Sequence, residues 1–251
     1  MPGVWSEPEQ LVLAARMLAA DGHCSGLAGQ MTQRLPDDTY RSLPIGVGFD
    51  EVQPRDLIRV DRDLNVVEGK GIPNPAVRFH IWVYGKRPDA MAIVHTHPPK
   101  ASALSMIGRP LVVSHMDTAM LYDDVAFLPE WPGVPVADDE GRIISAALGD
   151  KRSILLAHHG ILATGRDIVE ATYLAAAMEL AHHAQFAQAD RRTVNLADLK
   201  QLAQKECGNL FAASRHAFAN FDFSGAKQVG ARLAMHPAAT LQQQVMAWMT
   251  L

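Results

Sequence analysis

Two histidines stand at the end of an apolar run in the stretch AIVHTHP, residues 92–98. The run has the composition of a β-strand, and side chains alternate between the two faces of a strand, so His95 and His97 point the same way. Two imidazoles on one face can bind a divalent metal ion. An isolated His-x-His pair is as compatible with two half-buried imidazoles at a strand end, so a third ligand decides between the two interpretations.

A second apolar run, SILLA at residues 153–157, also ends in histidine and precedes His158, His159 and Gly160. If the two strands are neighbours in one sheet, their ends bring three imidazoles together. Such a set leaves coordination positions for substrate or water, which is typical of a catalytic metal site. We expect Gly160 to allow a sharp turn there. Periodicity does not decide whether His158 or His159 faces the metal.

The elements that position these histidines belong to one predicted α/β domain of 251 residues. Capping residues and apolar spacing predict helices over about residues 9–21, 74–86, 100–106, 139–149 and 167–189. Strands are predicted in QMTQRLP, IGVGF, LIRVD, NVVEG, AIVH, PLVVS, VAFLP and SILLA, with ILATG continuing the last run after the glycine. NLADLKQLAQKE and ATLQQQVMAWM predict terminal helices, which gives a core over about 6–190 and a helical extension over about 191–251.

The composition excludes several classes of partner. The chain is 48% hydrophobic and 20% charged, carries a net charge of −4 and has no block of Lys or Arg, so we expect neither nucleic acid nor membrane as a partner. The start MPGVWSEPEQ does not resemble a signal peptide, and we expect a cytoplasmic protein. Cys24 and Cys207 form no CxxC pattern, which argues against a disulfide framework or a thiolate zinc site.

Three stretches resemble the class II aldolase/adducin superfamily: AADGHCSGLAGQMTQR, RFHIWVYGKRPDAMAIVHTHP and LGDKRSILLAHHGILATGRDIVEA. The resemblance implies a three-layer α/β/α fold with a mostly antiparallel central sheet, assembled as a homotetramer with active sites between subunits. It also implies that His95, His97 and His159 are the metal ligands and hold one divalent ion per subunit. Zn, Mn, Fe and Co all remain candidates, because imidazole ligands alone do not select among them.

The chain departs from the sugar-phosphate aldolases of this superfamily at their acid/base glutamate. Their segment reads Ser-Ser-Glu-x-x-x-His, whereas IPNPAVRFH, aligned on His80, places Ala76 at the glutamate position. The phosphate-binding Gly-Asn motif is altered to Gly29-Gln30, and LPIGVGF replaces the usual Thr-x-Ser-Gly stretch. We therefore expect a non-phosphorylated, small-molecule carboxylate substrate, which a metal with open positions can chelate.

The Asn-Pro-Ala sequence at residues 74–76 resembles an adducin-like branch of the superfamily. That branch includes metal-dependent decarboxylases of hydroxylated aromatic acids, an iron oxygenase of a prenylated aryl-pyruvate, and adducin heads that lack the full histidine triad. The triad is complete here, so we expect a metal-dependent carbon–carbon lyase, and specifically a decarboxylase of a hydroxylated aromatic or keto acid. Retro-aldol cleavage, a non-haem Fe(II) oxygenase and a non-catalytic adducin-like module are the alternatives.

The stretch SHMDTAMLY stands where the resemblance places the aldolase tyrosine and the epimerase aspartate. It implies His115 or Asp117 as the acid that protonates the substrate carbon, with histidine favoured by its ordinary pKa near 6.5. The alternative is that both residues only form hydrogen bonds at a subunit interface.

The resemblance, together with the positions of the side chains beside the altered motif, also predicts substrate-binding residues, namely Asn74, Arg78, His80 and Tyr122. Arg78 could pair its N–H groups with a carboxylate, although a structural salt bridge explains it equally well. Packing is the alternative for Tyr122. His182 and His183 follow each other on a predicted helix and point about 100° apart, so we expect surface or packing positions for them.

Overall fold

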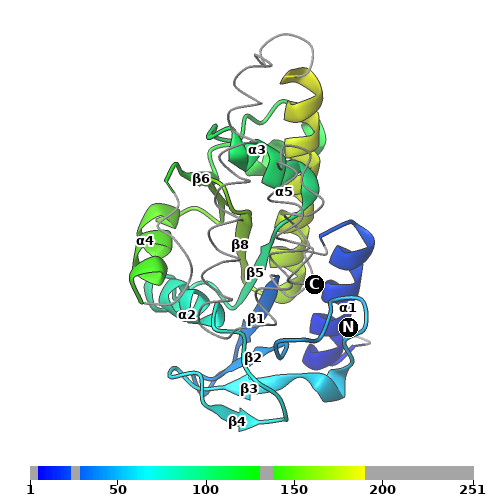
Figure 1. Cartoon of the computed structure of the whole chain (residues 1–251), viewed down its shortest axis with the longest axis vertical. Coiled ribbons are helices and arrows are strands. Elements are labelled where there is room, and N and C mark those ends of the chain that lie inside the picture. The colour runs from blue at the N-terminus through cyan, green and yellow to red at the C-terminus, as the bar shows by residue number, and fades with distance from the viewer. Residues whose placement is uncertain (1–4, 24–28, 131–137, 190–251) are drawn as a thin grey trace, which may run out of the picture. The chain divides into compact units, whose positions relative to one another are not determined.

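The computed structural model describes residues 5–23, 29–130 and 138–189 (Figure 1). The chain divides into a compact unit over Met1–Gln188 and a second over Ala189–Leu251. Cys24, Cys207 and the two predicted terminal helices lie outside the described residues. The division into a single domain with a helical extension therefore stays a prediction.

A central eight-stranded sheet organises the described residues, with the strands in the order β4-β3-β2-β1-β5-β8-β7-β6. Six of the neighbouring pairs are antiparallel, and β6 and β7 run parallel. The strands are β1 (Gln30–Arg34), β2 (Tyr40–Ser42), β3 (Ile58–Val60), β4 (Val66–Glu68), β5 (Ala92–Thr96), β6 (Val125–Leu128), β7 (Ser153–Leu156) and β8 (Ile161–Gly165).

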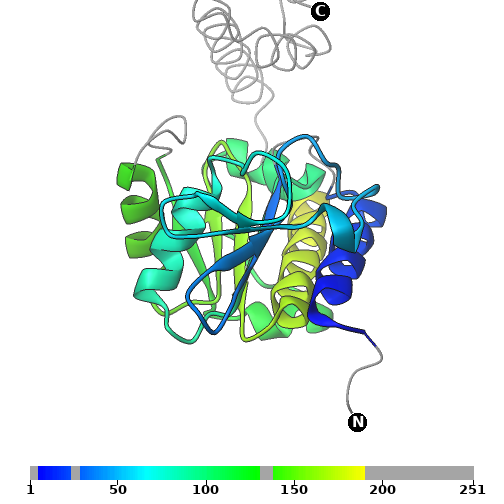
Figure 2. The same ribbon diagram turned by 90° about the horizontal axis from the view of Figure 1, so that it is seen from below.

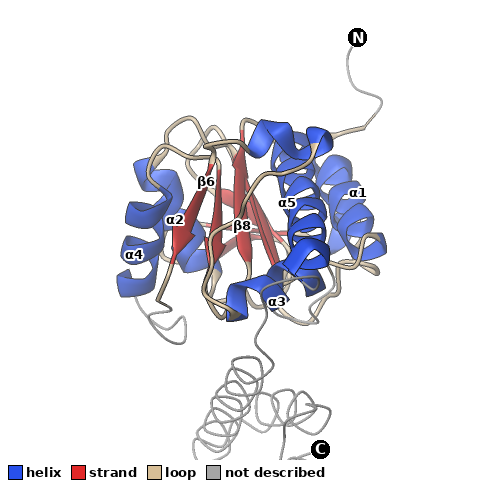
Figure 3. Ribbon diagram, turned by 90° about the horizontal axis from the view of Figure 1, so that it is seen from above, coloured by secondary structure: helices blue, strands red, loops and turns tan. Residues whose placement is uncertain are grey.

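Helices cover both faces of this sheet. They are α1 (Glu7–Ala20), α2 (Val77–Lys86), α3 (Pro99–Met106), α4 (Asp138–Leu148) and α5 (Ile168–Ala189), with short 3₁₀ helices η2 (Pro54–Asp56) and η3 (Met116–Leu121). Figure 3 shows α2 and α4 on one face of the sheet, and α1 and α5 on the other. Figure 2 shows α1 and α5 side by side along that second face.

The core has one apolar cluster on each face, as the alternation of side chains along a strand requires. In β5, Ala92 and Val94 pack with α1 and α5, whereas Ile93 packs with α2 and α4. The predicted α/β fold with helices around a central sheet is confirmed. The sheet is a mixed one, because the parallel pairing of β6 with β7 joins the antiparallel pairs.

Two predicted strands are wrong. In IGVGF, the chain forms a turn at Gly46, whose φ is 92°, and only Pro44 beside it forms an isolated bridge, with Pro73. In PLVVS, the main chain is held by a side chain: Val112 N–H donates to Gln185 Oε1 at 2.9 Å, and Gln185 Nε2 donates to the carbonyl of Pro110. Both segments have apolar residues typical of strands but pair with no strand of the described sheet.

None of the helices within the described residues is long and apolar enough to cross a membrane.

Helices α2 and α4 pack closely because a glycine stands at their contact. A Cβ atom added to Gly141 would lie 2.4 Å from Cδ1 and 2.8 Å from Cβ of Trp82. These atoms belong to the base of the side chain, so Trp82 cannot swing away without changing its rotamer. The indole is also held by its hydrogen bond from Nε1 to Asp138 Oδ1, at 3.0 Å.

Replacing Gly141 with alanine should therefore destabilise the protein by about 1–3 kcal/mol through overpacking, although alanine is the better helix former. Gly85 in α2 is the matched control, because a Cβ atom there meets nothing within 4 Å. Gly85→Ala should be neutral or stabilising by up to about 1 kcal/mol. Urea denaturation of the two variants measures the difference, and equal unfolding free energies would contradict this packing.

Candidate metal centre

Strand β5 places His95 in the middle of the sheet. β5 is hydrogen-bonded to β1 on one side and to β8 on the other, and His95 stands opposite Gln30 and Leu162. Its side chain is 1% exposed and points to the α2 face, where the ring of Phe79 meets it edge-on at 5.0 Å between centroids. His97 follows on the same face just beyond the end of the strand, and Pro98 and Pro99 lead into α3.

The third histidine comes from the turn between β7 and β8. These strands are antiparallel, so ILATG pairs back along SILLA and does not continue it as predicted. The turn is tight, with Leu156 N–H donating to the carbonyl of Gly160 at 2.8 Å. His158 has the left-handed conformation, with φ of 58°.

The sharp turn expected at Gly160 is present, and the glycine is needed there for space, since its φ is not positive. A Cβ atom at this position would lie 2.5 Å from the carbonyl oxygen of Thr96 and 2.6 Å from Cδ2 of His97. Only glycine lets the turn approach the end of β5 this closely. The approach brings His159 to the His95/His97 pair.

His95, His97 and His159 form one cluster. Their ring centroids are 4.8 Å apart for His95 and His97, 4.7 Å for His95 and His159, and 4.4 Å for His97 and His159. One ring nitrogen from each lies within 4.8 Å of the others. The structure thus brings together the three histidines that the resemblance selected.

His95 has the tautomer and the charge that a metal ligand requires. Its Nδ1 lies 2.9 Å from the main-chain carbonyl oxygen of Ile161, which can only accept, so Nδ1 carries the proton and the lone pair of Nε2 faces the cluster. Burial lowers the pKa of His95 to about 4, against a weaker opposing effect of the Ile161 carbonyl. The imidazole is therefore neutral at pH 7, as metal binding requires.

The cluster fits a divalent ion in its spacing and in its donor set. Nε2 of His95 and Nε2 of His97 are 3.0 Å apart. Two nitrogens that each lie about 2.1 Å from one ion, at roughly a right angle, have a separation of about 3.0 Å. Within the described residues the cluster contains no carboxylate, so all three candidate ligands are imidazoles.

The start of α2 forms an apolar wall beside the cluster. Phe79 is 2% exposed and lies against His95, and Ala76, which the resemblance aligns with the aldolase glutamate, is 7% exposed and belongs to the same apolar cluster as Phe79. The helix begins at Val77, later than the predicted start at Pro75. Asn74 still acts as a cap, because its Oδ1 accepts a hydrogen bond from Ala76 N–H at 3.0 Å.

His80 lies in the layer behind His95 and is fully buried. Its Nδ1 is 2.9 Å from Thr32 Oγ1, which lies 2.8 Å from the hydroxyl of Tyr84, and its ring centroid is 6.4 Å from that of His95. Burial lowers its pKa well below the ordinary value. These contacts tie α2 to β1, and the substrate contact expected for His80 stays a prediction.

His23 supports the cluster from the opposite face, and sequence reasoning missed it. Its buried ring follows the end of α1, and its Nδ1 lies 2.9 Å from Oγ1 of Thr96, the residue between the two histidines of β5. The stretch GHCSG contains this histidine directly after Gly22, but nothing in the local pattern indicates the contact with residue 96.

The remaining predicted site residues lie at the surface. Arg78 is on the outer face of α2, where its Nη1 donates to the carbonyl of Arg62 at 3.1 Å and its Nε is 3.8 Å from Asp138 Oδ1. His115 precedes η3 and accepts a hydrogen bond from Asp117 N–H at 3.2 Å. These two side chains are 56% and 58% exposed. The nearby Tyr122 is 78% exposed.

Comparison with known proteins identifies the family. The model of the class II aldolase and adducin N-terminal domain matches residues 9–186. The chain belongs to this family. Among solved structures, the L-fuculose 1-phosphate aldolase of Glaciozyma antarctica superposes with a TM-score of 0.69 at 28% identity, over 82% of this chain and 85% of that one.

Two curated relatives show the range of named activities in the family. Decarboxylase NovR of Streptomyces niveus is 32% identical over 64% of this chain, but the match spans only 61% of its own length. The 5-methylthioribulose-1-phosphate/5-deoxyribulose-1-phosphate aldolase of Rhodospirillum rubrum is 32% identical over 67% of this chain and 75% of its own length. The resemblance to a family of metal-dependent lyases is confirmed.

Buried neutral histidines should make the stability of the fold fall in acid. His182, which lies outside the cluster, allows this expectation to be tested. Burial lowers the pKa of His182 to about 4, although its hydrogen bond to the carbonyl of Met178 opposes the shift. In the unfolded chain the imidazole of His182 binds a proton near pH 6.5. In the folded chain it binds a proton only near pH 4. Stability is therefore full above pH 6.5 and falls towards pH 4, by about 1.4 kcal/mol per pH unit for this group.

Replacing His182 with leucine should reduce the pH dependence of the unfolding free energy by up to about 1.4 kcal/mol per pH unit, and His183→Leu, at an exposed neighbouring position, serves as the comparison for the loss of a histidine. Urea denaturation at several values between pH 7.5 and 4.5 measures both variants. An identical pH slope for His182→Leu and wild type would contradict the assignment.

Proposed function

We propose that this protein is a divalent-metal-dependent carbon–carbon lyase, specifically a decarboxylase of a non-phosphorylated hydroxylated aromatic or keto acid. The observation that carries the proposal is the cluster of three histidines with Phe79 packed against His95 and Ala76 in the same apolar cluster as Phe79. The histidines provide a metal site, while the position that family aldolases fill with a glutamate base holds a methyl group.

Neutral ligands suit a carboxylate substrate. His95, His97 and His159 would hold the ion without cancelling any of its charge, so the site attracts an anion. When bound, the ion supplies a Lewis acid that stabilises negative charge on a substrate oxygen. The described cluster also lacks the carboxylate of the two-histidine, one-carboxylate set common in Fe(II) oxygenases, which favours a lyase.

The apolar wall suits loss of CO2. The side chains of Ala76 and Phe79 cannot hydrogen-bond a carboxylate, and the buried ring of Phe79 meets the His95 ring edge-on at 5.0 Å between centroids. The bond between the carboxyl carbon and its neighbour breaks, the electron pair stays on the neighbouring carbon and its conjugated oxygen, and CO2 leaves. No base is needed for this step, but an acid must then donate a proton to carbon.

We propose that His115 or Asp117 of a neighbouring subunit is that acid, in a homotetramer with active sites between subunits. Both side chains are more than half exposed, and Met116 and Tyr122 on the same segment are 82% and 78% exposed. Large apolar side chains at such exposure are typical of a surface that another chain covers. Tyr122 would then line the neighbour's substrate pocket.

Retro-aldol cleavage is the second candidate, and the named aldolases among the relatives favour it. Cleavage of an aldol requires removal of a hydroxyl proton and yields an aldehyde. Ala76 cannot remove that proton, so the aldolase reaction would need a base from elsewhere in the chain.

Metal content is the first test. The purified protein should hold about one divalent ion per chain, and His95→Ala and His159→Ala should each lose it while keeping the circular dichroism of the wild type. His183→Ala is the control, since this exposed histidine lies outside the cluster. A wild type that takes up no divalent ion from solution would refute the metal-dependent reaction.

The product separates the candidate reactions. The metal-loaded protein, incubated with a panel of hydroxylated aromatic acids and keto acids, should release CO2 without consuming oxygen. An aldehyde product would establish the aldolase, oxygen uptake would establish an oxygenase, and turnover by His95→Ala equal to wild type would exclude the histidine cluster from the reaction.

Gly160→Ala should weaken the same site without removing a ligand. The added methyl group must displace the carbonyl of Thr96 or the ring of His97, so we expect metal affinity to fall by about tenfold or more. Competition with a chelator of known affinity measures this change. Gly85→Ala is the control, because its added methyl meets no atom within 4 Å, and equal affinities for the two variants would contradict the role of Gly160.

A further inference from the structure

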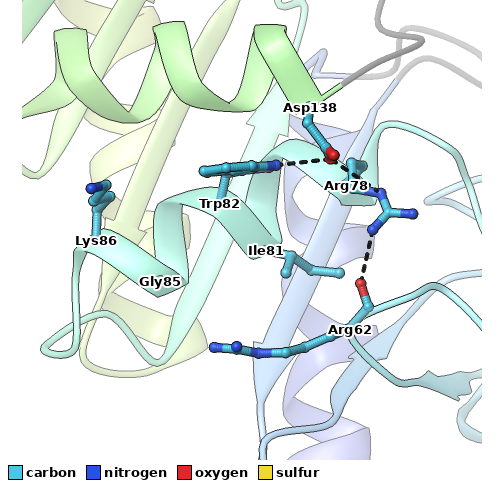
Figure 4. Close-up of a pocket in the computed structure, with 7 residues that line it drawn as sticks. All are labelled: Arg62, Arg78, Ile81, Trp82, Gly85, Lys86 and Asp138. Carbon is cyan, nitrogen blue, oxygen red and sulfur yellow. Dashed lines mark hydrogen bonds and ion pairs between the residues drawn. The ribbon is translucent and has the colours of Figure 1, made fainter.

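A pocket of about 360 Å³ lies on the outer face of α2, below the first turn of α4. Figure 4 shows its two sides: the indole of Trp82 faces α4, and the Arg62 side chain extends beneath Ile81. Residues Arg78, Trp82, Gly85 and Lys86 are spaced so that they share one face of the helix. The opposite face carries His80 and Tyr84, which contact Thr32 of β1, and none of the three clustered histidines lines the pocket, so it is separate from the histidine cluster.

The charge of the pocket is strongly positive. Arg62, Arg78 and Lys86 line it together with a single carboxylate, that of Asp138. Asp138 is already engaged, because it accepts a hydrogen bond from Trp82 and lies 3.8 Å from Nε of Arg78. Among the described residues no ion pair involves Arg62 or Lys86, although the Tyr40 hydroxyl and, at longer range, Asp38 act on the Arg62 guanidinium and raise its pKa.

Gly85 is the second observation that points to a ligand. It lies in the last turn of α2 and lacks the positive φ that would require glycine, and a Cβ atom there would meet nothing. Glycine costs helix stability relative to alanine, and no contact within the described chain explains it. Gly141, by contrast, is required by Trp82. A bare backbone at Gly85 leaves room for a ligand to lie against the helix.

We propose that this pocket binds a small multivalent anion, a phosphate- or polycarboxylate-bearing molecule. Arg62 and Lys86 supply charge-assisted hydrogen bonds to the anionic groups. The Trp82 indole and the open surface at Gly85 accommodate the body of the ligand. The site lies outside the histidine cluster, so this proposal does not depend on the proposed reaction.

Isothermal titration of the full-length protein tests the proposal, with inorganic pyrophosphate and citrate as the two probes at matched ionic strength. We expect saturable binding of one probe per chain. Arg62→Ala and Lys86→Ala should each weaken it by about tenfold or more, and Gly85→Leu, which fills the pocket, should abolish it. Lys70→Ala, which removes an exposed cation outside the pocket, should leave affinity unchanged.

Stability measurements separate a ligand site from a structural role. Arg78 donates to the main-chain carbonyl of Arg62, so Arg62→Ala keeps that bond. Gly85→Leu should unfold at the same or a higher temperature than the wild type, because leucine is the better helix former. Loss of binding without loss of stability supports the site.

Repeating the titration with His95→Ala excludes binding of the probe to a metal at the cluster, and we expect unchanged affinity. Binding of pyrophosphate alone would identify a phosphate ligand, and binding of citrate alone would identify a polycarboxylate. Failure of both probes to bind saturably would overturn the proposal. So would binding that survives in Arg62→Ala, Lys86→Ala and Gly85→Leu.

Discussion

The close approach of the β7–β8 turn to the end of β5 is the contact on which the rest of the site depends. Strand order puts β8 beside β5, with Ile161 opposite Thr96. At Gly160 the missing side chain lets the turn contact Thr96 and His97 directly. His159 then reaches His95 and His97, and the end of β5 and the β7–β8 turn together provide a single set of ligands.

The surroundings of the cluster keep His95 neutral and fix its orientation. The Ile161 carbonyl sets the tautomer of His95, and burial keeps its pKa far below neutrality. Thr96 is held from behind by His23. On the α2 side, Phe79 packs against His95 and Ala76 supplies no acid or base. Polar groups thus support the ligands from behind, whereas the α2 side offers only apolar side chains. This difference is the physical basis for favouring loss of CO2 over proton abstraction.

Sequence reasoning predicted the helices and strands that have a strong local pattern. It failed where contacts between residues far apart in the chain determine the structure. The apolar runs before His95 and His158 are strands, because central strands buried on both faces have few polar residues. PLVVS has the same local composition, yet Gln185 takes its main-chain hydrogen bonds. The contacts of His23 with Thr96 and of Gly160 with His97 join residues far apart in the chain, so periodicity could not reveal them.

The most direct test of the central claim is X-ray absorption at the edge of the bound metal. If His95, His97 and His159 hold the ion, the wild type should show about three imidazole nitrogens at roughly 2.0–2.1 Å, and His159→Ala should show two. A spectrum without imidazole scattering, or one that His159→Ala leaves unchanged, would contradict the assignment of these histidines as the metal site.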